Sequence, residues 1–491
     1  MALSINIWYN TAIEKETKMI GRVRERQELE ASLSASEAQL IAVCGRRRVG
    51  KTYLVRESFQ GKFFFEHAGI MHGTMAEQLS EFSDSLRRAG LEDVRPLRGW
   101  RDAFNELERL ISTKRRTGKK VLFIDEMPWM DTPKSGFLMA FEVFWNGWCS
   151  GRNDVVFVIC GSATSWIVKK VFRNKGGLYN RTTGRIFLEP FTLAECRELV
   201  ESKGIILGDD ELAEAYMIFG GVPYYWTLLS KGRSLAQNID QLCFVAGGKL
   251  RHEFDELYAS LFENGGAHLR LVRELAECKS GMTQKELLAA AGVSSGGNGK
   301  RYLEELEQSG FVRKFTSYGK RKRDSQYQLI DCFTLFHLKF VAGESNPDEC
   351  YWQHSVNSPK INAWRGLAFE RVCFWHIRQI KKALGVSGVM TQVYCWRHVA
   401  DDVYPVGAQI DMLIERADRV INVCEMKFTS RPFSMDKNYL ERLKIKLGAF
   451  EQVTKTRSAM HLTLVTAAGL LHNKHSGIVQ SEVTLDDLFA E

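Results

Sequence analysis

Three uninterrupted runs of apolar residues in the first third of the chain predict buried strands. They cover residues 40–44, 121–124 and 155–160, and the second run is followed at once by Asp125 and Glu126. Strands that read as continuous apolar runs are typical of parallel sheets covered by helices on both faces. We therefore predict an α/β domain with a parallel sheet at the N-terminal end.

The middle of the chain has helical periodicity, broken by one turn at 220–225. Apolar residues recur at helical spacing through 191–249, and three further helices are predicted near 268–278, 283–288 and 300–308. Two short strands, 311–315 and 326–329, then flank the basic run Gly319-Lys320-Arg321-Lys322-Arg323. Three helices followed by a basic hairpin predict a winged-helix module.

The last third alternates between helices and strands. We predict a helix over 364–381, strands over 392–396, 409–414 and 420–427, a helix over 435–450 and a final strand over 461–466. This order predicts a second α/β domain. The whole pattern predicts four regions in the chain, with the bounds 19–190, 191–265, 266–341 and 342–491.

Length and composition fit this division. A chain of 491 residues exceeds one typical core, and its 45% apolar and 26% charged residues are usual for a globular protein. The 11 cysteines form no C-x-x-C pair, and no apolar run approaches the ~20 residues that span a bilayer. We expect a cytoplasmic protein without a membrane partner. The net charge of +8 permits a nucleic-acid partner without requiring one.

A glycine-rich segment between the first strand and a helical pattern predicts a phosphate-binding loop. It matches G-x-x-x-x-G-K-[ST]. Such loops wrap a polyphosphate with backbone N–H groups at a helix N-terminus, while the lysine reaches the terminal phosphates and the threonine hydroxyl contacts Mg²⁺. The residues assigned to ATP are Gly45, Arg46, Arg47, Arg48, Val49, Gly50, Lys51, Thr52 and Tyr53.

The ends of the next two strands supply the remaining chemistry of an ATPase. Asp125 is predicted to hold Mg²⁺, and Glu126 to orient or deprotonate the attacking water. Ser162 could sense the γ-phosphate, although a helix cap is an equally good interpretation. Arg181 could stabilise transition-state charge in cis or in trans, and Pro223 suits an adenine-side clamp or an ordinary turn.

The chain resembles prokaryotic P-loop ATPases related to the STAND and AAA+ groups. The residues that carry the resemblance are Ile20-Gly21-Arg22-x-x-Glu25, the loop 45–52, 122–126, Cys160-Gly161-Ser162, 188–191 and Gly221-Val222-Pro223. Asn180-Arg181 stands where that family usually has Gly-Arg. The resemblance implies ATP binding with slow or regulated hydrolysis, a winged-helix module, and a C-terminal domain similar to PD-(D/E)xK nucleases.

In that C-terminal domain, Asp411 and Glu425-Met426-Lys427 occupy the nuclease motif positions, and Glu370 matches the acid of the first helix. If the hairpin turns near Ala417, residue 425 lies opposite 409, and Gln409, Asp411, Glu425 and Lys427 share one face. Asp411 and Glu425 would then hold Mg²⁺ or Mn²⁺ beside Lys427. The alternative is a surface Glu–Lys pair in an inactive domain.

Together these features predict an ATP-binding regulator, with DNA or another nucleic acid as a partner and homo-oligomers possible. The basic run is either a phosphate contact or a solvated hairpin tip. The competing interpretation is a nucleotide-switched signalling or scaffold protein.

Overall fold

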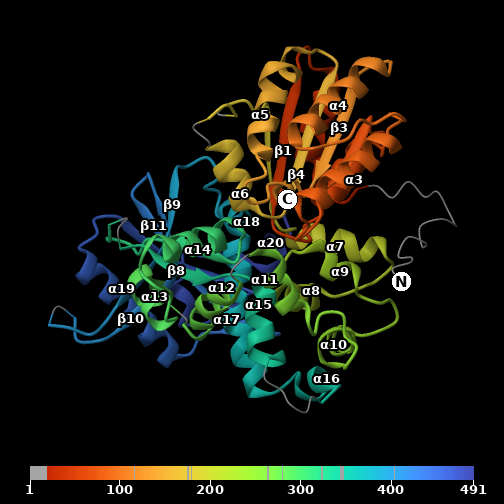
Figure 1. Cartoon of the computed structure of the whole chain (residues 1–491). Helices are drawn as coiled ribbons and strands as arrows, with labels where there is room; N and C mark the ends of the chain where they lie inside the picture. The colour runs from red at the N-terminus through yellow and green to blue at the C-terminus, as the bar shows by residue number, and fades with distance from the viewer. Residues whose placement is uncertain are drawn as a thin grey trace.

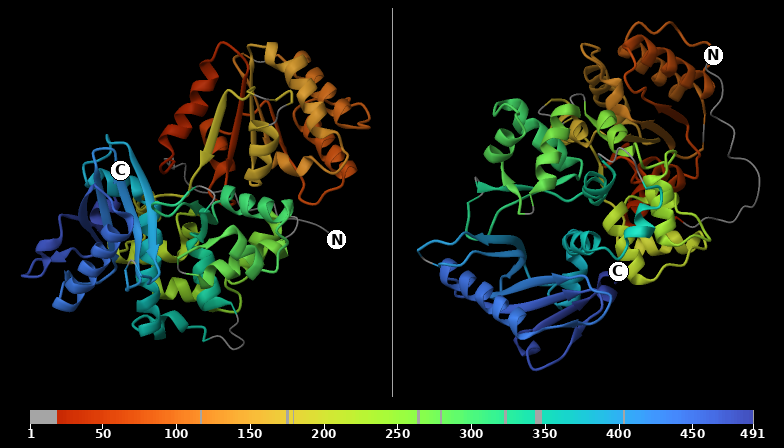
Figure 2. Two further views of the ribbon diagram at one scale, coloured as in Figure 1. Left: turned by 90° about the vertical axis from the view of Figure 1, so that its left-hand side faces the viewer. Right: turned by 90° about the horizontal axis from the view of Figure 1, so that it is seen from below.

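The computed structural model describes residues 19–115, 117–173, 176–178, 180–262, 265–278, 280–321, 324–342, 348–402 and 404–490. Figure 1 shows a parallel sheet with its helices at one end, a helical middle, and a second sheet at the other end. The right-hand view of Figure 2 shows the two sheets apart, with the helical middle between them.

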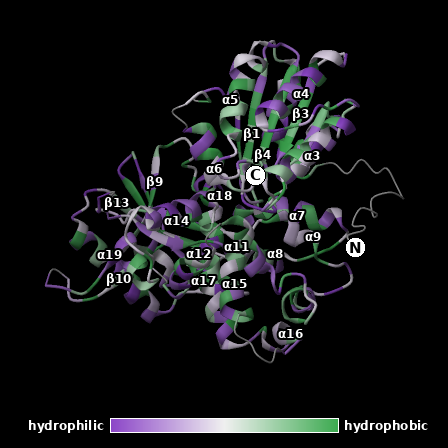
Figure 3. Cartoon of the chain, viewed as in Figure 1, coloured by the Kyte–Doolittle hydropathy of each residue, from purple (hydrophilic) through white to green (hydrophobic). Residues whose placement is uncertain are grey.

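The first sheet has five parallel strands in the order β2-β3-β4-β1-β5. The predicted strands 40–44, 121–124 and 155–160 are confirmed, and two shorter strands escaped prediction. Figure 3 shows these strands as the apolar centre of the domain. Their bounds are β1 (Gln39–Gly45), β2 (Phe65–Ala68), β3 (Lys120–Asp125), β4 (Val155–Gly161) and β5 (Gly184–Leu188).

Helices cover both faces of this sheet because successive strand side chains point to opposite sides. On one face α1 (Val23–Ala31) and α2 (Lys51–Ser58) pack on Ile41, Val43 and Phe123. On the other face α3 (Met75–Arg88), α4 (Trp100–Thr113) and α5 (Phe137–Gly147) pack on the alternate residues. The short helix α6 (Thr164–Ile167) follows β4.

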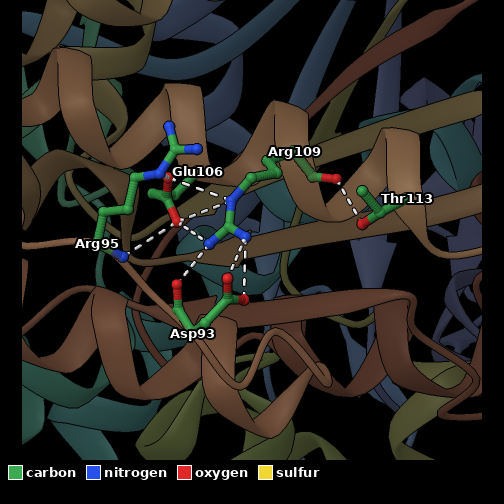
Figure 4. Close-up of polar contacts among 5 residues, drawn as sticks. All are labelled: Asp93, Arg95, Glu106, Arg109 and Thr113. Carbon is green, nitrogen blue, oxygen red and sulfur yellow. Dashed lines mark hydrogen bonds and ion pairs between the residues drawn. The ribbon is translucent and has the colours of Figure 1, made fainter.

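A polar network fixes the connection from α3 to α4 (Figure 4). The carboxylate of Glu106, only 4% exposed, accepts hydrogen bonds from the Arg95 backbone and the Arg109 guanidinium. Arg109 also binds both carboxylate oxygens of Asp93 at 2.9 and 3.0 Å. These contacts tie the connection to Glu106 and Arg109 of α4.

The helical middle follows the first sheet in the chain and has two parts. The first part contains helices, and the second contains helices around a small sheet. The first part is α7 (Leu193–Ser202), α8 (Asp209–Phe219), α9 (Pro223–Thr227), α10 (Leu235–Ile239) and α11 (Glu253–Leu261). The second part is α12 (Gly265–Glu277), β6 (Met282–Thr283), α13 (Gln284–Ala290), α14 (Gly297–Gln308), β7 (Val312–Phe315) and β8 (Gln326–Leu329). Its three antiparallel strands lie in the order β6-β8-β7.

Four helices lead to the second sheet: α15 (Cys332–Phe336), α16 (Tyr351–Ser355), α17 (Pro359–Trp375) and α18 (Ile377–Ala383). The prediction of one helix over 364–381 is wrong in its bounds, because His376 leaves helical geometry and separates α17 from α18. The buried His376 ring accepts a hydrogen bond from the Leu193 N–H of α7 at 2.9 Å, a long-range contact that sequence periodicity does not reveal.

The second sheet has the order β15-β13-β11-β10-β9. Strands β9, β10 and β11 are antiparallel neighbours, whereas β11, β13 and β15 are parallel. The predicted order of elements is found. Their bounds are β9 (Thr391–His398), β10 (Ala408–Arg416), β11 (Val420–Lys427), β12 (Phe433–Ser434), α19 (Lys437–Thr454), β13 (Ala459–Thr466), β14 (Leu470–Leu471), β15 (Ser481–Thr484) and α20 (Leu485–Leu488).

The middle and the second sheet share one apolar core. A single cluster of buried side chains runs from Phe191 to Phe489. The hairpin between β7 and β8 also docks on the second sheet, where Ser317 forms a parallel bridge with Cys395 of β9 and the Tyr318 N–H donates to the Cys395 carbonyl. Among the described residues, no helix combines the length and apolar character needed to cross a membrane.

Candidate functional site: the phosphate loop and the C-terminal carboxylates

The predicted phosphate loop connects β1 to α2 and is held in an unusual backbone conformation. Arg48 has a φ of 69° and Gly50 a φ of 91°, both in the left-handed region. A Cβ atom on Gly45 would lie 2.4 Å from the carbonyl oxygen of Leu188, so only glycine allows this approach to β5. Val49 is buried in the core beneath the loop, whereas Tyr53 is 50% exposed.

The side chains of Lys51 and Thr52 make contacts within the loop and with the end of β3. The Lys51 ammonium donates to the carbonyl oxygens of Gly45 and Arg46 at 3.0 and 2.9 Å. The Thr52 hydroxyl donates to Asp125 Oδ2 at 2.6 Å, and Asp125 Oδ1 accepts the Glu126 N–H. The sheet therefore brings the end of β3 beside the start of α2, although β4 lies between β3 and β1.

Glu126 and Ser162 form one unit at the ends of β3 and β4. One carboxylate oxygen of Glu126 accepts both the backbone N–H and the hydroxyl of Ser162 at 2.9 Å. Glu126 itself is left-handed, with φ 44° and ψ 43°. Such strain in a residue other than glycine is typical of functional positions. The contact connects Ser162 to the predicted water-orienting carboxylate.

The residues present fit a nucleotide with a divalent cation. A threonine hydroxyl beside an aspartate offers the oxygen ligands that Mg²⁺ prefers. A Cβ atom on Gly50 would meet nothing within 4 Å, so the loop is open there, and the ammonium of Lys51 lies at its base. Arg47 Nη1 is buried without a partner among the described residues, as expected beside an anion.

Two loop arginines, however, direct their side chains away from the loop. Arg46 forms an ion pair with Asp331, just before α15, and stacks on the Phe311 ring. Arg48 forms an ion pair with Glu253 at 2.7 Å and stacks on the Tyr224 ring. With these side chains occupied, only the backbone groups of Arg46 and Arg48 are available for the predicted phosphate contact.

The structure separates Arg181 from the loop, and Pro223 begins a helix that contacts the Arg48 side chain. In β5, Gly184 pairs with Ile41 and Leu188 with Gly45, so Arg181 precedes the end of β5 that lies far from the phosphate loop. At ~3.3 Å per residue along the strand, the distance from Arg181 to the start of the loop at Gly45 is about 20 Å. This contradicts a cis role for Arg181. Pro223 begins α9, and its neighbour Tyr224 lies against Arg48.

In the C-terminal domain, Glu370 of α17 lies within electrostatic reach of both predicted metal ligands. Burial, together with the charges of Asp411 and Glu425, raises the pKa of Glu370 to about 7, although Arg371 and Lys427 act to lower it. Its carboxylate accepts a hydrogen bond from Arg371 at 3.3 Å, while Asp411 accepts one from Gln409 at 2.6 Å.

Glu425 is surrounded by cations. It binds Lys446 at 2.6 Å, Lys427 at 3.0 Å and the Tyr439 hydroxyl at 2.6 Å. Burial opposes ionisation, but the charges of Lys446 and Lys427 prevail and lower the pKa of Glu425 to about 2. Sequence reasoning missed Lys446 and Tyr439, because only the packing of α19 on the sheet brings them to Glu425. Within the described ranges, no three His, Cys, Asp or Glu side chains converge as a metal site.

Asp411 contacts Gln409 and Glu425 contacts Lys427, but the strand alternation behind the predicted shared face is interrupted beside Asp411. The predicted register pairs residue 413 with 421, but Leu413 pairs with Val423, two residues further along. Because the register differs by an even number of residues, each side chain of β11 stays on its predicted face of the sheet. Between Ile410 and Leu413, however, β10 bulges against β9, and both of these side chains pack in the same core cluster. The bulge interrupts the alternation on which the argument depended.

The basic hairpin is partly described. Lys320 and Arg321 are exposed, whereas Lys322 and Arg323 lie outside the described residues. The base of the same hairpin packs on β9 close to Asp411, where Ser317, Gln326, Cys395 and Asp411 line a small shared cavity.

Comparisons with known proteins agree with the phosphate-loop geometry. Residues 19–229 match the family described as an ATPase domain predominantly from Archaea. An uncharacterized protein of Methanocaldococcus jannaschii is 22% identical in an alignment of 395 residues that covers 78% of this chain and 83% of that protein.

Among solved structures, a Walker-type ATPase of Pyrococcus abyssi is similar over 65% of this chain and 96% of its own, with 18% identity and a TM-score of 0.47. A STAND protein of Pyrococcus horikoshii with a tetratricopeptide repeat sensor is similar over 75% of this chain and 52% of its own, with 15% identity and a TM-score of 0.30. From the family match and the loop geometry together, residues 19–229 form an ATP-binding P-loop ATPase domain.

Proposed function

We propose that this protein is an ATP-hydrolysing regulator in which the state of the nucleotide loop controls a nucleic-acid-binding module and a nuclease-like domain. The observation that carries the proposal is the set of contacts at the loop: Lys51 at its base, Thr52 beside Asp125, and Glu126 held by Ser162. These are the groups that bind, position and hydrolyse a nucleoside triphosphate.

The residues divide this work between binding and catalysis. Lys51 exchanges its carbonyl partners for phosphate oxygens, and Thr52 with Asp125 would hold Mg²⁺, which neutralises phosphate charge when bound. Glu126 orients the attacking water and accepts its proton. In the structure Ser162 donates two hydrogen bonds to Glu126, so we propose that it positions that carboxylate rather than capping a helix.

The module of residues 266–341 supports a winged-helix assignment. The order α12-β6-α13-α14-β7-β8 with an antiparallel sheet is what such a module requires, and Lys320 and Arg321 are exposed at its hairpin. We propose that these two residues contact nucleic-acid phosphates.

For the C-terminal domain, the raised pKa of Glu370 beside Asp411 supports a metal-dependent nuclease with Asp411 and Glu425 as ligands and Lys427 as a charge-stabilising group. Mg²⁺ or Mn²⁺ would supply the activated water. The competing function is a nucleotide-switched scaffold. It is favoured by the neutralisation of Glu425 by Lys427 and Lys446, which leaves both of its oxygens occupied.

Calorimetry and a phosphate-release assay test the ATPase assignment. Lys51→Ala should abolish binding of ATP with Mg²⁺, whereas Lys231→Ala, an exposed lysine in the helical middle, should not alter it. Glu126→Gln should bind ATP but release less than about 1% of the wild-type phosphate, because an amide accepts no proton from water. Unchanged ATP affinity in Lys51→Ala would remove the basis of the proposal.

A further inference from the structure

Two ion pairs attach the phosphate loop to the second half of the protein. The Arg46 and Asp331 side chains are 5% and 1% exposed, so their pair is almost wholly removed from water. Asp331 also accepts the Thr334 N–H at 2.9 Å and thereby caps α15. A loop residue is thus tied to the start of a helix nearly three hundred residues later.

The second ion pair attaches the loop to α11. Glu253, at the first position of that helix, is 1% exposed and receives both Arg48 at 2.7 Å and the Tyr225 hydroxyl at 3.1 Å. Arg48 is the loop residue with the left-handed backbone. Since a non-glycine residue adopts that conformation only when its surroundings hold it, the ion pair with Glu253 helps to set the shape of the loop.

The nucleotide-binding lysine touches the same part of the loop. Lys51 donates to the carbonyl oxygen of Arg46, while the side chain of Arg46 holds Asp331. A polyphosphate that takes over the Lys51 ammonium releases this carbonyl and changes the hydrogen bonding of the residue that anchors α15. The contacts therefore run without a break from Lys51 through Arg46 to α15.

We propose that Arg46 and Arg48 are positioning residues that couple nucleotide occupancy to the docking of α15 and α11, through Asp331 and Glu253. The inference rests on the proposed function, because it requires ATP at the loop. According to this inference, the side chains of Arg46 and Arg48 control how α15 and α11 dock on the loop. The ion pairs pre-organise the loop for ATP, and bound ATP in turn strengthens the docking of both helices.

The burial of the two pairs makes the coupling strong. Arg46 Nε and Nη2 are buried without a partner among the described residues, so Asp331 is the acid that compensates this charge. Removing one partner of a buried pair leaves the other charge uncompensated, which is costly. Coupling between two sites is also reciprocal: if loss of Asp331 weakens ATP binding, ATP must stabilise the contact of Asp331 by the same factor.

The test uses the full-length chain and two measurements. Asp331→Asn keeps an oxygen that can cap α15 but removes the charge, and Glu253→Gln does the same at α11. Glu214→Gln is the matched control, because it breaks the ion pair of Glu214 with Arg365, which joins α8 to α17 with 13% and 12% exposure and does not touch the loop. ATP affinity is measured by calorimetry, and exchange of backbone amides in α11 and α15 by mass spectrometry with and without ATP.

In the wild type, ATP with Mg²⁺ should slow amide exchange in α11 and α15 about fivefold or more. Asp331→Asn and Glu253→Gln should each weaken ATP binding by about fivefold or more, and each should lose the response of its own helix. Glu214→Gln should keep the wild-type affinity and response.

The inference is overturned if the wild type binds ATP without any change in exchange at α11 and α15, a result that needs no variant to fold. It is also overturned if both variants bind ATP as the wild type does. Failure of the wild type to bind ATP at all would instead refute the proposed function, and this inference with it.

Discussion

His376 makes the stability of the second half depend on pH. Its Nδ1–H donates to the Val372 carbonyl at 2.7 Å, and its Nε2 accepts the Leu193 N–H. Only the bond from the Leu193 N–H requires a neutral ring, because a protonated ring could still donate to Val372 but could not accept at Nε2. The side chain is fully buried. Burial outweighs the bond to Val372 and lowers the pKa of His376 to about 4 from 6.5.

The sign and size of the effect follow from linkage. Between pH 6.5 and 4 the unfolded chain binds a proton at His376 that the folded chain does not, so stability is full above pH 6.5 and is lost on acidification. The shift from 6.5 to about 4 corresponds to about 3 kcal/mol in total, at about 1.4 kcal/mol per pH unit. About 2 kcal/mol of this should disappear between pH 7 and pH 5.

Urea unfolding followed by tryptophan fluorescence measures this loss, since Trp226 and Trp352 lie in the same buried cluster. His376→Gln keeps an acceptor for the Leu193 N–H but cannot be protonated. The difference in free energy of unfolding by which the wild type exceeds His376→Gln should therefore shrink by about 2 kcal/mol from pH 7 to pH 5. The other buried histidines are present in both proteins, so their contributions to the free energy of unfolding cancel in this difference.

His354→Gln is the control, because His354 is exposed on α16 and loses only a surface ion pair with Asp348, so its difference from the wild type should change by less than about 1 kcal/mol between pH 7 and pH 5. A difference between His376→Gln and the wild type that stays constant from pH 7 to pH 5 would refute the reasoning.

Three further outcomes are expected. Replacing Lys320 and Arg321 by Ala should lower the slope of log affinity for DNA against log salt by about one unit for each lost phosphate contact, and an unchanged slope in a salt titration would assign both residues to solvent. Asp411→Asn should eliminate any Mg²⁺- or Mn²⁺-dependent nicking while ATP hydrolysis continues; a wild type that never nicks would favour the scaffold function. Gly221→Ala should destabilise the protein by more than about 2 kcal/mol in thermal unfolding, because its Cβ would lie 1.9 Å from the Phe191 carbonyl oxygen, and an unchanged melting temperature would contradict this.

The phosphate loop could be predicted because its chemistry is local. Gly45, Gly50, Lys51 and Thr52 lie within eight residues, and the strand and helix around them have clear periodicity. Asp125 followed because parallel strands end at a common edge, where the structure places it 2.6 Å from Thr52.

The partners of this loop could not be predicted in the same way. Asp331 and Glu253 occupy unremarkable positions in the sequence, one before a short helix and the other at a helix start. Their contacts with Arg46 and Arg48 depend on how the helical middle packs against the sheet. For the same reason the bulge at Asp411 was missed, because an extra residue in one strand leaves no mark in an alternating apolar pattern.

The docking of the Ser317–Tyr318 segment on β9 also bears on aggregation. β9 is the edge strand of the second sheet, and an uncovered edge offers free N–H and C=O groups to other chains. Here the segment after β7 covers part of that edge through the bridge to Cys395. A fragment that begins after residue 341 would expose the edge, so the second sheet should remain soluble only when the preceding hairpin is included.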